Sequence, residues 1–233
     1  MKIVYWSDFQ CPWCWIGEAR LKHAVEAMPE LGKVEYEMKA FQLNPRAGDH
    51  AVALTRDRLI SEDGMTPAQA DEKVRNTNAI AKAEGLEFNY GTSLFTNTES
   101  AHRLVKLAYS KNDPELYDRI ITALFKLYFT DNKELADKAL LKQTAVDCGM
   151  DGAEVETFLA GDEYKKEVMQ DQWEAGSYNI HGVPFFIIGR YGVSGAESTD
   201  YFKAVLKQAL KEQQEAEAPK STGGMHCGPD GCK

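Results

Sequence analysis

Apolar and polar residues at the start of the chain follow first a strand pattern and then a helical one. Residues 2–6 are a short run rich in β-branched and aromatic residues, which predicts a buried strand. From Pro12 to residue 28, apolar residues recur at helical spacing and charged residues occupy the other face. Residues 34–41 alternate apolar with charged residues, which predicts a second, half-buried strand. Together these segments predict a βαβ unit with two parallel strands.

Between residues 50 and 161 helical segments alternate with turn signals, and no strand pattern stands out. Helices are expected to start after Thr66, Thr98 and Asp113, because a Thr or Asp before Pro or Glu can accept a hydrogen bond from a free first-turn amide. This middle section therefore predicts an all-helical insert. The expected helices cover residues 67–83, 99–109, 114–129, 133–148 and 151–159.

Strand signals return near the end of the chain, after a helical segment over residues 163–178. Residues 185–188 predict a buried strand, and residues 191–196 can pair with it because the Gly and Arg between them offer a tight turn. Pro184 comes just before this strand. Proline donates no ladder hydrogen bond, so it suits the first residue or the edge of a strand. A last amphipathic helix is expected over residues 201–210.

The composition limits the function classes. Hydrophobic residues make up 43% and charged residues 27% of the chain, as in an ordinary soluble globular protein. The formal net charge of −9 argues against a surface for nucleic acid or anionic membranes, because phosphate binding needs clustered Lys and Arg. No apolar stretch approaches the roughly 20 residues that span a bilayer, and the start of the chain lacks a signal-peptide pattern. A cytoplasmic protein is therefore expected.

Five cysteines carry the candidate chemistry, since in a reducing compartment they are more typical of catalysis, redox sensing or metal binding than of structural disulfides. Cys11 and Cys14 come directly after the first predicted strand, where the helix begins. Pro12 suits the first helical turn, because its φ is already helical and its missing N–H has no partner there. Free amides and the helix dipole at that end favour a thiolate, which predicts Cys11 as the nucleophile. The more shielded Cys14 would attack a mixed disulfide on Cys11 and release the partner.

Two other interpretations of this pair stay open. The two residues could be structural thiols that are close in sequence by chance. They could also be half of a zinc site, whose four tetrahedral ligands would need a second pair from the far end of the chain. Elsewhere, His102 and Cys148 are interpreted as buried core residues, and no metal-ligand set is assigned.

The end of the chain holds a second cysteine pair. Residues 212–224 have the composition of a fraying helix end and a flexible linker. Cys227 and Cys232 follow, separated by four residues that include Gly and Pro, and His226 precedes the first of them. This pair could form a disulfide and pass electrons to the first pair, hold a soft metal with His226, or be incidental.

The βαβ start, Cys-Pro-Trp-Cys at residues 11–14, the helical insert and Gly-Val-Pro at residues 182–184 before a ββα ending resemble the DsbA branch of the thioredoxin superfamily. The chain is similar to its cytoplasmic FrnE-like subgroup over nearly its whole length, to about residue 210. Some FrnE-like proteins also carry a second, more widely spaced cysteine pair near the C-terminus, as Cys227 and Cys232 do.

The resemblance implies an α/β, thioredoxin-like fold with a large all-helical insertion. Residues 1–48 (βαβ) and residues 163–215 (αββα) would form the two parts of the thioredoxin-like domain. Residues 49–162 would be the helical insertion domain over the active site, and residues 216–233 a flexible C-terminal tail with the CX4C pair.

For the site, the resemblance implies that the Val183–Pro184 bond is cis and faces Cys11, with Val183 backbone atoms pairing to an extended substrate peptide. Pro12 and Trp13 would complete the substrate-binding residues. DsbA itself has His at the position of Trp13, where it helps to hold the thiolate. An indole cannot donate a positive charge, so a less oxidising couple than that of DsbA is expected.

These features predict a thiol–disulfide oxidoreductase that acts on protein or small-molecule disulfides, without a cofactor beyond its own redox-active disulfide and with glutathione as a possible partner. One alternative is a glutathione-dependent isomerase or transferase. Relatives of that kind usually have Ser where this chain has Cys11, so both thiols together favour dithiol exchange. The other alternative is a metal-binding or metal-stress protein built from both cysteine pairs. No nucleic-acid or membrane partner is expected, and the helical insert could offer a homodimer surface.

Overall fold

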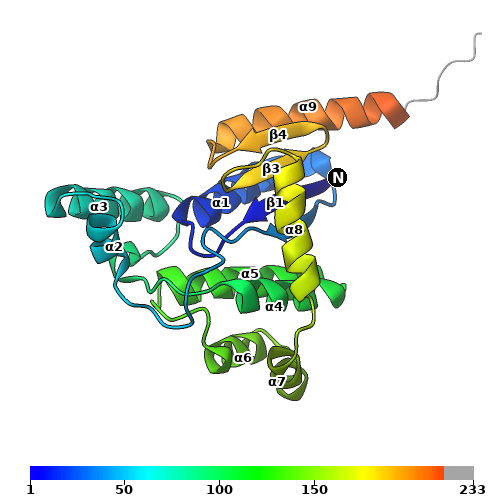
Figure 1. Cartoon of the computed structure of the whole chain (residues 1–233). Helices are drawn as coiled ribbons and strands as arrows, with labels where there is room; N and C mark the ends of the chain where they lie inside the picture. Colours follow the sequence, from blue (N-terminus) through cyan, green and yellow to red (C-terminus); the bar gives the residue numbers. More distant parts are fainter. Residues whose placement is uncertain (218–233) are drawn as a thin grey trace, which may run out of the picture.

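The computed structural model describes residues 1–217 of the chain. A four-stranded sheet with the strand order β2-β1-β3-β4 lies at its centre (Figure 1). β1 (Lys2–Ser7) and β2 (Glu35–Ala40) are parallel, which confirms the predicted βαβ pairing. β3 (Phe185–Ile188) is antiparallel to β1, and it forms the predicted hairpin with β4 (Tyr191–Ser194).

The two faces of the sheet pack against different helices. Tyr5 of β1 belongs to the larger core, on the side where α1 (Pro12–Glu26) and α9 (Thr199–Glu217) contact each other. Trp6, the next residue, belongs to a smaller core on the other face, which α8 (Lys165–Ser177) covers. This alternation is the one expected of successive strand residues. Figure 1 shows α9 and α8 on these separate sides.

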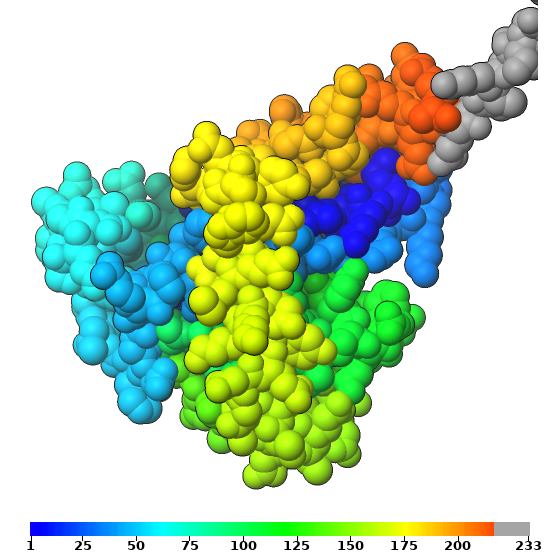
Figure 2. Space-filling view, turned by 45° about the vertical axis from the view of Figure 1, so that its right-hand side comes forward, coloured from blue at the N-terminus to red at the C-terminus, as the bar shows by residue number. Residues whose placement is uncertain are grey.

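Helices fill the segment between β2 and α8, as the sequence predicts. α4 and α5 lie alongside the sheet region, α2 and α3 form one end of the molecule, and α6 and α7 lie farthest from the sheet (Figure 1). In Figure 2, α8 (yellow) runs along the outside between the part that holds the sheet and the lowest helices. The bounds are α2 (Thr55–Ser61), α3 (Pro67–Ala83), α4 (Glu99–Ser110), α5 (Pro114–Phe129), α6 (Lys138–Asp147) and α7 (Gly152–Ala160), with 3-10 turns η1 (Pro29–Leu31) and η2 (Tyr90–Thr92).

One aromatic stack joins the α1 side of the sheet to these helices. Trp15 of α1 stacks on Phe88 and on Phe125 of α5, with ring centroids 5.2 and 5.5 Å apart. Phe88 in turn stacks on Phe129 at 4.4 Å. The large core is therefore continuous from the sheet into the helical segment. The exact domain boundaries assigned from the sequence stay a prediction.

Several element bounds differ from those expected. α6 starts at Lys138 and not at residue 133, because the Asp137 side chain accepts hydrogen bonds from two first-turn amides. α4 starts as expected, but Thr98 makes no side-chain cap bond, and Asn97 Oδ1 accepts the Glu99 N–H at 2.8 Å instead. α9 continues to Glu217, past the expected end at residue 210, through a run of good helix formers.

Helix α2 was not anticipated at all. It is only seven residues long and carries few apolar positions, so its periodicity is too short to stand out in the sequence. No helix within residues 1–217 is long and apolar enough to cross a membrane.

Candidate active site

Cys11 and Cys14 lie at the junction of β1 and α1, as the sequence predicts. Cys11 is the N-cap residue of α1 in an extended conformation, with Pro12 in the first turn. The Cys14 amide donates to the Cys11 carbonyl at 3.0 Å, which closes the turn between them. Both thiols are free, and Cys14 is the more deeply buried, with 1% exposed against 5% for Cys11. The junction thus holds a reduced dithiol at a helix N-terminus.

The segment before β3 faces the first of these thiols. The Val183–Pro184 peptide bond is cis, as the resemblance implies. Cys11 Sγ donates to the Val183 carbonyl at 3.5 Å. A Cβ atom on Gly17 of α1 would lie only 3.2 Å from Pro184 Cγ, a tight contact, so glycine suits this close approach. Two segments more than 170 residues apart in sequence therefore meet at Cys11.

Cys14 has a different environment. Burial raises the pKa of its thiol well above the ordinary value, and a hydrogen bond to Cys11 adds to that rise. The Ser7 hydroxyl and the Asp8 amide act in the opposite direction, and the Asp8 N–H lies 3.4 Å from Cys14 Sγ. Cys14 is thus held as a neutral thiol at physiological pH.

A buried histidine lies beside this turn. His102 of α4 and Asp8 are 1% and 0% exposed, and His102 Nε2 lies 3.4 Å from Asp8 Oδ1. Asp8 Oδ2 accepts the Leu43 N–H at 2.7 Å. His102 is buried, as the sequence analysis expects, but its contact with Asp8 was not predicted. Nothing local links residues 8 and 102, and no sequence signal in a single chain would have paired them.

A groove opens in front of Cys11. Its volume is about 630 Å³, and it lies between the cysteine turn and helices α2 and α3. Trp13, 40% exposed, flanks it from the turn. Arg58 stacks over the ring of Phe95 at 3.5 Å and binds Glu62 through two nitrogens. The lining also includes Arg46, Lys73 and Tyr90. Except for residues 11–13, sequence reasoning missed this lining, in part because α2 itself was missed.

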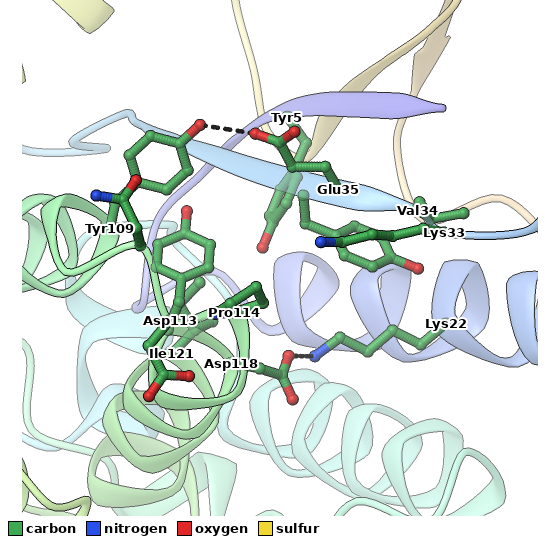
Figure 3. Close-up of a pocket in the computed structure, with 13 residues that line it drawn as sticks. Tyr5, Lys22, Lys33, Val34, Glu35, Tyr109, Asp113, Pro114, Asp118 and Ile121 are labelled. Carbon is green, nitrogen blue, oxygen red and sulfur yellow. Dashed lines mark hydrogen bonds and ion pairs between the residues drawn. The ribbon is translucent and has the colours of Figure 1, made fainter.

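A second cavity, of about 250 Å³, lies away from the thiols (Figure 3). Four tyrosines line it, at positions 5, 36, 109 and 117. Figure 3 shows the Tyr109 hydroxyl donating to Glu35, at 3.0 Å, and the Lys22 ammonium paired with Asp118. Burial raises the pKa of Tyr36 to about 12, so its phenol stays neutral. Neither Cys11 nor Cys14 lines this cavity.

Cys148 does not line the groove. Cys148 is half-buried rather than fully buried, and its thiol contacts the Arg119 carbonyl at 3.7 Å. Cys227, Cys232 and His226 lie outside the described residues. Within residues 1–217 no group of three or more His, Cys, Asp or Glu side chains could hold a metal ion.

Comparisons with known proteins identify the family and the fold of the chain. The model of the DSBA-like thioredoxin domain matches residues 2–207. A probable DsbA oxidoreductase from Streptomyces coelicolor has a similar crystal structure, with 34% identity, a TM-score of 0.86, and coverage of 100% of this chain and 98% of the other. The uncharacterized protein YwbO of Bacillus subtilis is 24% identical over 215 residues, which cover 91% of this chain and 98% of YwbO.

A more distant structure shares the fold. The cytosolic disulfide reductase DsbM from Pseudomonas aeruginosa, with GSH, has a TM-score of 0.59 at 14% identity, with 93% of this chain and 99% of that chain covered. The resemblance to the DsbA branch and the expected α/β fold with a helical insertion are both confirmed. The chain belongs to the DSBA-like thioredoxin domain family, and it is a thiol–disulfide oxidoreductase of that family.

Proposed function

We propose that the chain exchanges disulfides through Cys11 as nucleophile and Cys14 as resolving thiol. One observation carries this assignment: Cys11 caps α1 at the edge of the groove and contacts the Val183 carbonyl of the cis-proline segment. Cys14 lies behind it, buried and neutral, and so cannot be the first thiol that meets a substrate.

The exchange has two steps. The Cys11 thiolate attacks one sulfur of a substrate disulfide, and the other sulfur leaves as a thiolate that takes up a proton. Cys14 then loses its proton and attacks Cys11 Sγ, which forms the Cys11–Cys14 disulfide and releases the second substrate thiol. The substrate gains two electrons and the dithiol loses two. The same steps in reverse oxidise a substrate dithiol.

Val183 and Pro184, with Pro12 and Trp13, are the proposed substrate-binding residues. An extended peptide can pair with the Val183 backbone in β-strand fashion, next to the sulfur that it must reach. The groove also suits a small anionic disulfide such as oxidised glutathione, because three cations (Arg46, Arg58 and Lys73) and two carboxylates (Glu62 and Asp63) line it. Arg58 and Lys73 pair with these carboxylates, so Arg46 is the proposed partner for a carboxylate of the substrate. The GSH in the structure of DsbM is consistent with this second substrate class.

Single substitutions test the assignment, with oxidised glutathione or insulin as substrate. We expect Cys11→Ser to abolish exchange and Cys14→Ala to stop turnover after formation of a mixed disulfide at Cys11, visible by mass spectrometry. Cys148→Ser, which removes a free thiol away from the groove, is the matched control and should leave exchange intact. Activity that survives Cys11→Ser would refute the assignment. Full turnover in Cys14→Ala would favour a glutathione-dependent isomerase or transferase.

The C-terminal pair, Cys227 and Cys232, is proposed to relay electrons to the first pair. The measurement is the reduction potential of the Cys11–Cys14 couple with and without residues 219–233, and an unchanged potential and turnover would count against a relay. Stoichiometric zinc that is lost with Cys227→Ser would instead support metal binding. Membership of the FrnE-like subgroup stays a prediction. A cytoplasmic location and a homodimer are also predictions; cell fractionation tests the location and sedimentation tests the dimer.

A further inference from the structure

The cavity of about 250 Å³ in Figure 3 is not used by the proposed disulfide exchange. It lies where α1, the start of β2 and the link between α4 and α5 meet. Its walls are mostly apolar, with a few polar groups among them, which is the usual form of a small-molecule site. The apolar walls include Tyr5, Val34, Tyr36, Tyr109, Tyr117 and Ile121.

The phenols in these walls are protonated at physiological pH. Burial is the main cause that raises the pKa of Tyr36 to about 12. Burial also raises the pKa of Tyr5 and of Tyr117 well above the ordinary value. A protonated phenol can donate one hydrogen bond and accept others. Each of these hydroxyls therefore has a hydrogen that needs an acceptor.

One of these hydroxyls has only half of its hydrogen bonds. Tyr117 is 6% exposed, and its oxygen accepts the Met38 N–H at 2.7 Å. The hydrogen of this hydroxyl has no acceptor among residues 1–217. Tyr109 differs, because its hydroxyl donates to Glu35 at 3.0 Å. A buried donor without an acceptor costs free energy, so the Tyr117 hydroxyl suits a ligand that brings an acceptor.

Most charged groups of the lining already have partners. Lys22 pairs with Asp118, and its ammonium lies 2.8 Å from Glu18 Oε1, behind the lining. Figure 3 shows the Lys22–Asp118 pair on one side of the cavity and the Tyr109–Glu35 pair on another. Neither a cation nor an anion therefore finds a free counter-ion at these positions.

Two further charged groups line the cavity. Asp113 Oδ1 accepts two first-turn amides of α5 at 3.0 Å each. Lys33 is exposed, and its ammonium has no ion pair within the described residues. An anion at Lys33 would compete with water there and would also face the carboxylates of Glu35 and Asp113. A buried cation would face Lys22 and Lys33. The lining thus favours an uncharged ligand.

We propose that this cavity binds a small, uncharged aromatic molecule that carries a carbonyl oxygen. The carbonyl accepts the hydrogen of the Tyr117 hydroxyl, and the ring lies against the tyrosine rings. Tyr109 and Tyr117 already pack edge to face, with centroids 5.2 Å apart, in the range of about 4.5–7 Å that suits a further ring.

The ligand is small, because the cavity of about 250 Å³ is below the roughly 300–1,000 Å³ of sites for drug-sized molecules. No cysteine lines the cavity, so this inference does not rest on the proposed function. Failure of the exchange assay would leave it unchanged.

The test titrates the full chain with three probes that share one benzene ring: acetophenone, benzoate and phenyltrimethylammonium. NMR of carbon-labelled tyrosine rings follows binding. We expect acetophenone to shift the signals of Tyr36, Tyr109 and Tyr117 saturably, with a Kd on the order of 1 mM for a ligand of this size. Benzoate and phenyltrimethylammonium should bind at least about tenfold more weakly, because each would bury a charge without a free counter-ion.

Two variants test the hydrogen bond to the carbonyl. Tyr117→Phe should weaken acetophenone binding about fivefold, because it removes the donor of one hydrogen bond. Tyr109→Phe is the matched control, since it removes a hydroxyl that already donates to Glu35. It should change the Kd by less than about twofold.

The absence of saturable shifts would overturn the site, and equal or tighter binding of either ion would overturn the ligand class. Equal weakening in both variants would overturn the role of the Tyr117 hydroxyl. If Tyr117→Phe fails to fold because the Met38 amide loses its acceptor, Val34→Trp carries the test. It fills the cavity from the residue before β2 and should abolish the shifts, and unchanged shifts would refute the proposal.

Discussion

At the scale of single residues, Cys11 and Cys14 divide the work of exchange because their surroundings differ. Cys11 ends the turn at the groove and contacts the Val183 carbonyl, so a substrate sulfur can reach it. Cys14 is one turn into α1, shielded from water, with a raised pKa. A neutral resolving thiol does not compete for the substrate in the first step. It becomes a nucleophile only when its proton has an acceptor.

The raised pKa of Cys14 predicts how the stability of the reduced protein changes with pH. A group whose pKa is higher in the folded state than in the unfolded state stabilises the fold fully below the unfolded pKa, and this contribution is lost as pH rises. The free energy of unfolding should therefore start to fall above about pH 8.5, the ordinary thiol value. Urea unfolding of the reduced protein at several pH values between 7 and 9.5 measures this fall in the free energy of unfolding.

The comparison for this prediction is Cys14→Ser, which keeps Cys11 and Cys148 and removes only the Cys14 thiol. Its free energy of unfolding should decline less over the same interval, before the tyrosines ionise. If the free energy of unfolding declined in parallel with pH in the two reduced proteins, Cys14 would have the same pKa in the folded and unfolded states, which would contradict the prediction.

At the scale of elements, the site depends on how closely α1 approaches the cis-proline segment that directly precedes β3. Gly17 permits this approach: an added Cβ would lie 3.2 Å from Pro184 Cγ, from Phe186 Cζ and from the Ala196 backbone. Gly17 therefore leaves room for the cis-proline segment whose Val183 carbonyl contacts Cys11. Arg20, on the next turn, adds a hydrogen bond to the Ala196 carbonyl at 2.8 Å.

Gly17→Ala should destabilise the protein by about 1–3 kcal/mol, because the extra methyl overpacks the contact between helix and proline. The rate of exchange should fall as well, since the shift occurs beside Cys11. Gly176→Ala in α8 is the matched control, with open space around the added methyl, and it should stabilise the protein by up to about 1 kcal/mol. Urea midpoints and exchange rates of both variants check this. Equal stability of the two variants would contradict the close approach.

At the scale of the whole molecule, the sheet and the inserted helices share one core. Trp15 of α1 stacks on Phe125 of α5, and Tyr117 of α5 accepts the Met38 N–H of β2 at 2.7 Å. The groove lies between the parts that these contacts join, so its shape depends on both. A shared core of this kind favours cooperative unfolding.

We therefore expect one unfolding transition for residues of both parts. Far-ultraviolet circular dichroism, which is dominated by the helices, and tryptophan fluorescence, which includes Trp6 and Trp15 near the sheet, should give coincident urea curves. Trp15→Ala should lower the urea midpoints seen by both probes together. The free energy of unfolding should fall by about 3–5 kcal/mol. Two separate unfolding transitions, or a midpoint lowered by Trp15→Ala for one probe only, would indicate that the sheet part and the helical part are independently stable.

The sequence by itself determined what depends on neighbouring residues. The strand before Cys11, the helix that Pro12 starts and the Asp113 cap of α5 follow from local patterns, and each lies where predicted. The family resemblance, carried by such motifs, was sufficient for the fold. The short α2 and the start of α6 were missed or misplaced, because side-chain caps and tertiary contacts outweigh a weak periodicity.

The tertiary structure alone decided which distant residues meet at the dithiol. The groove lining from α2 and α3, the contact of Cys11 with Val183, and the pairing of Asp8 with His102 bring together residues 40 to 170 positions apart. Such contacts form when apolar faces of separate elements are buried together, and a side chain then meets whatever the opposite element presents. His102 looks like a core residue in the sequence, and the packing of α4 against the cysteine turn makes it the partner of Asp8.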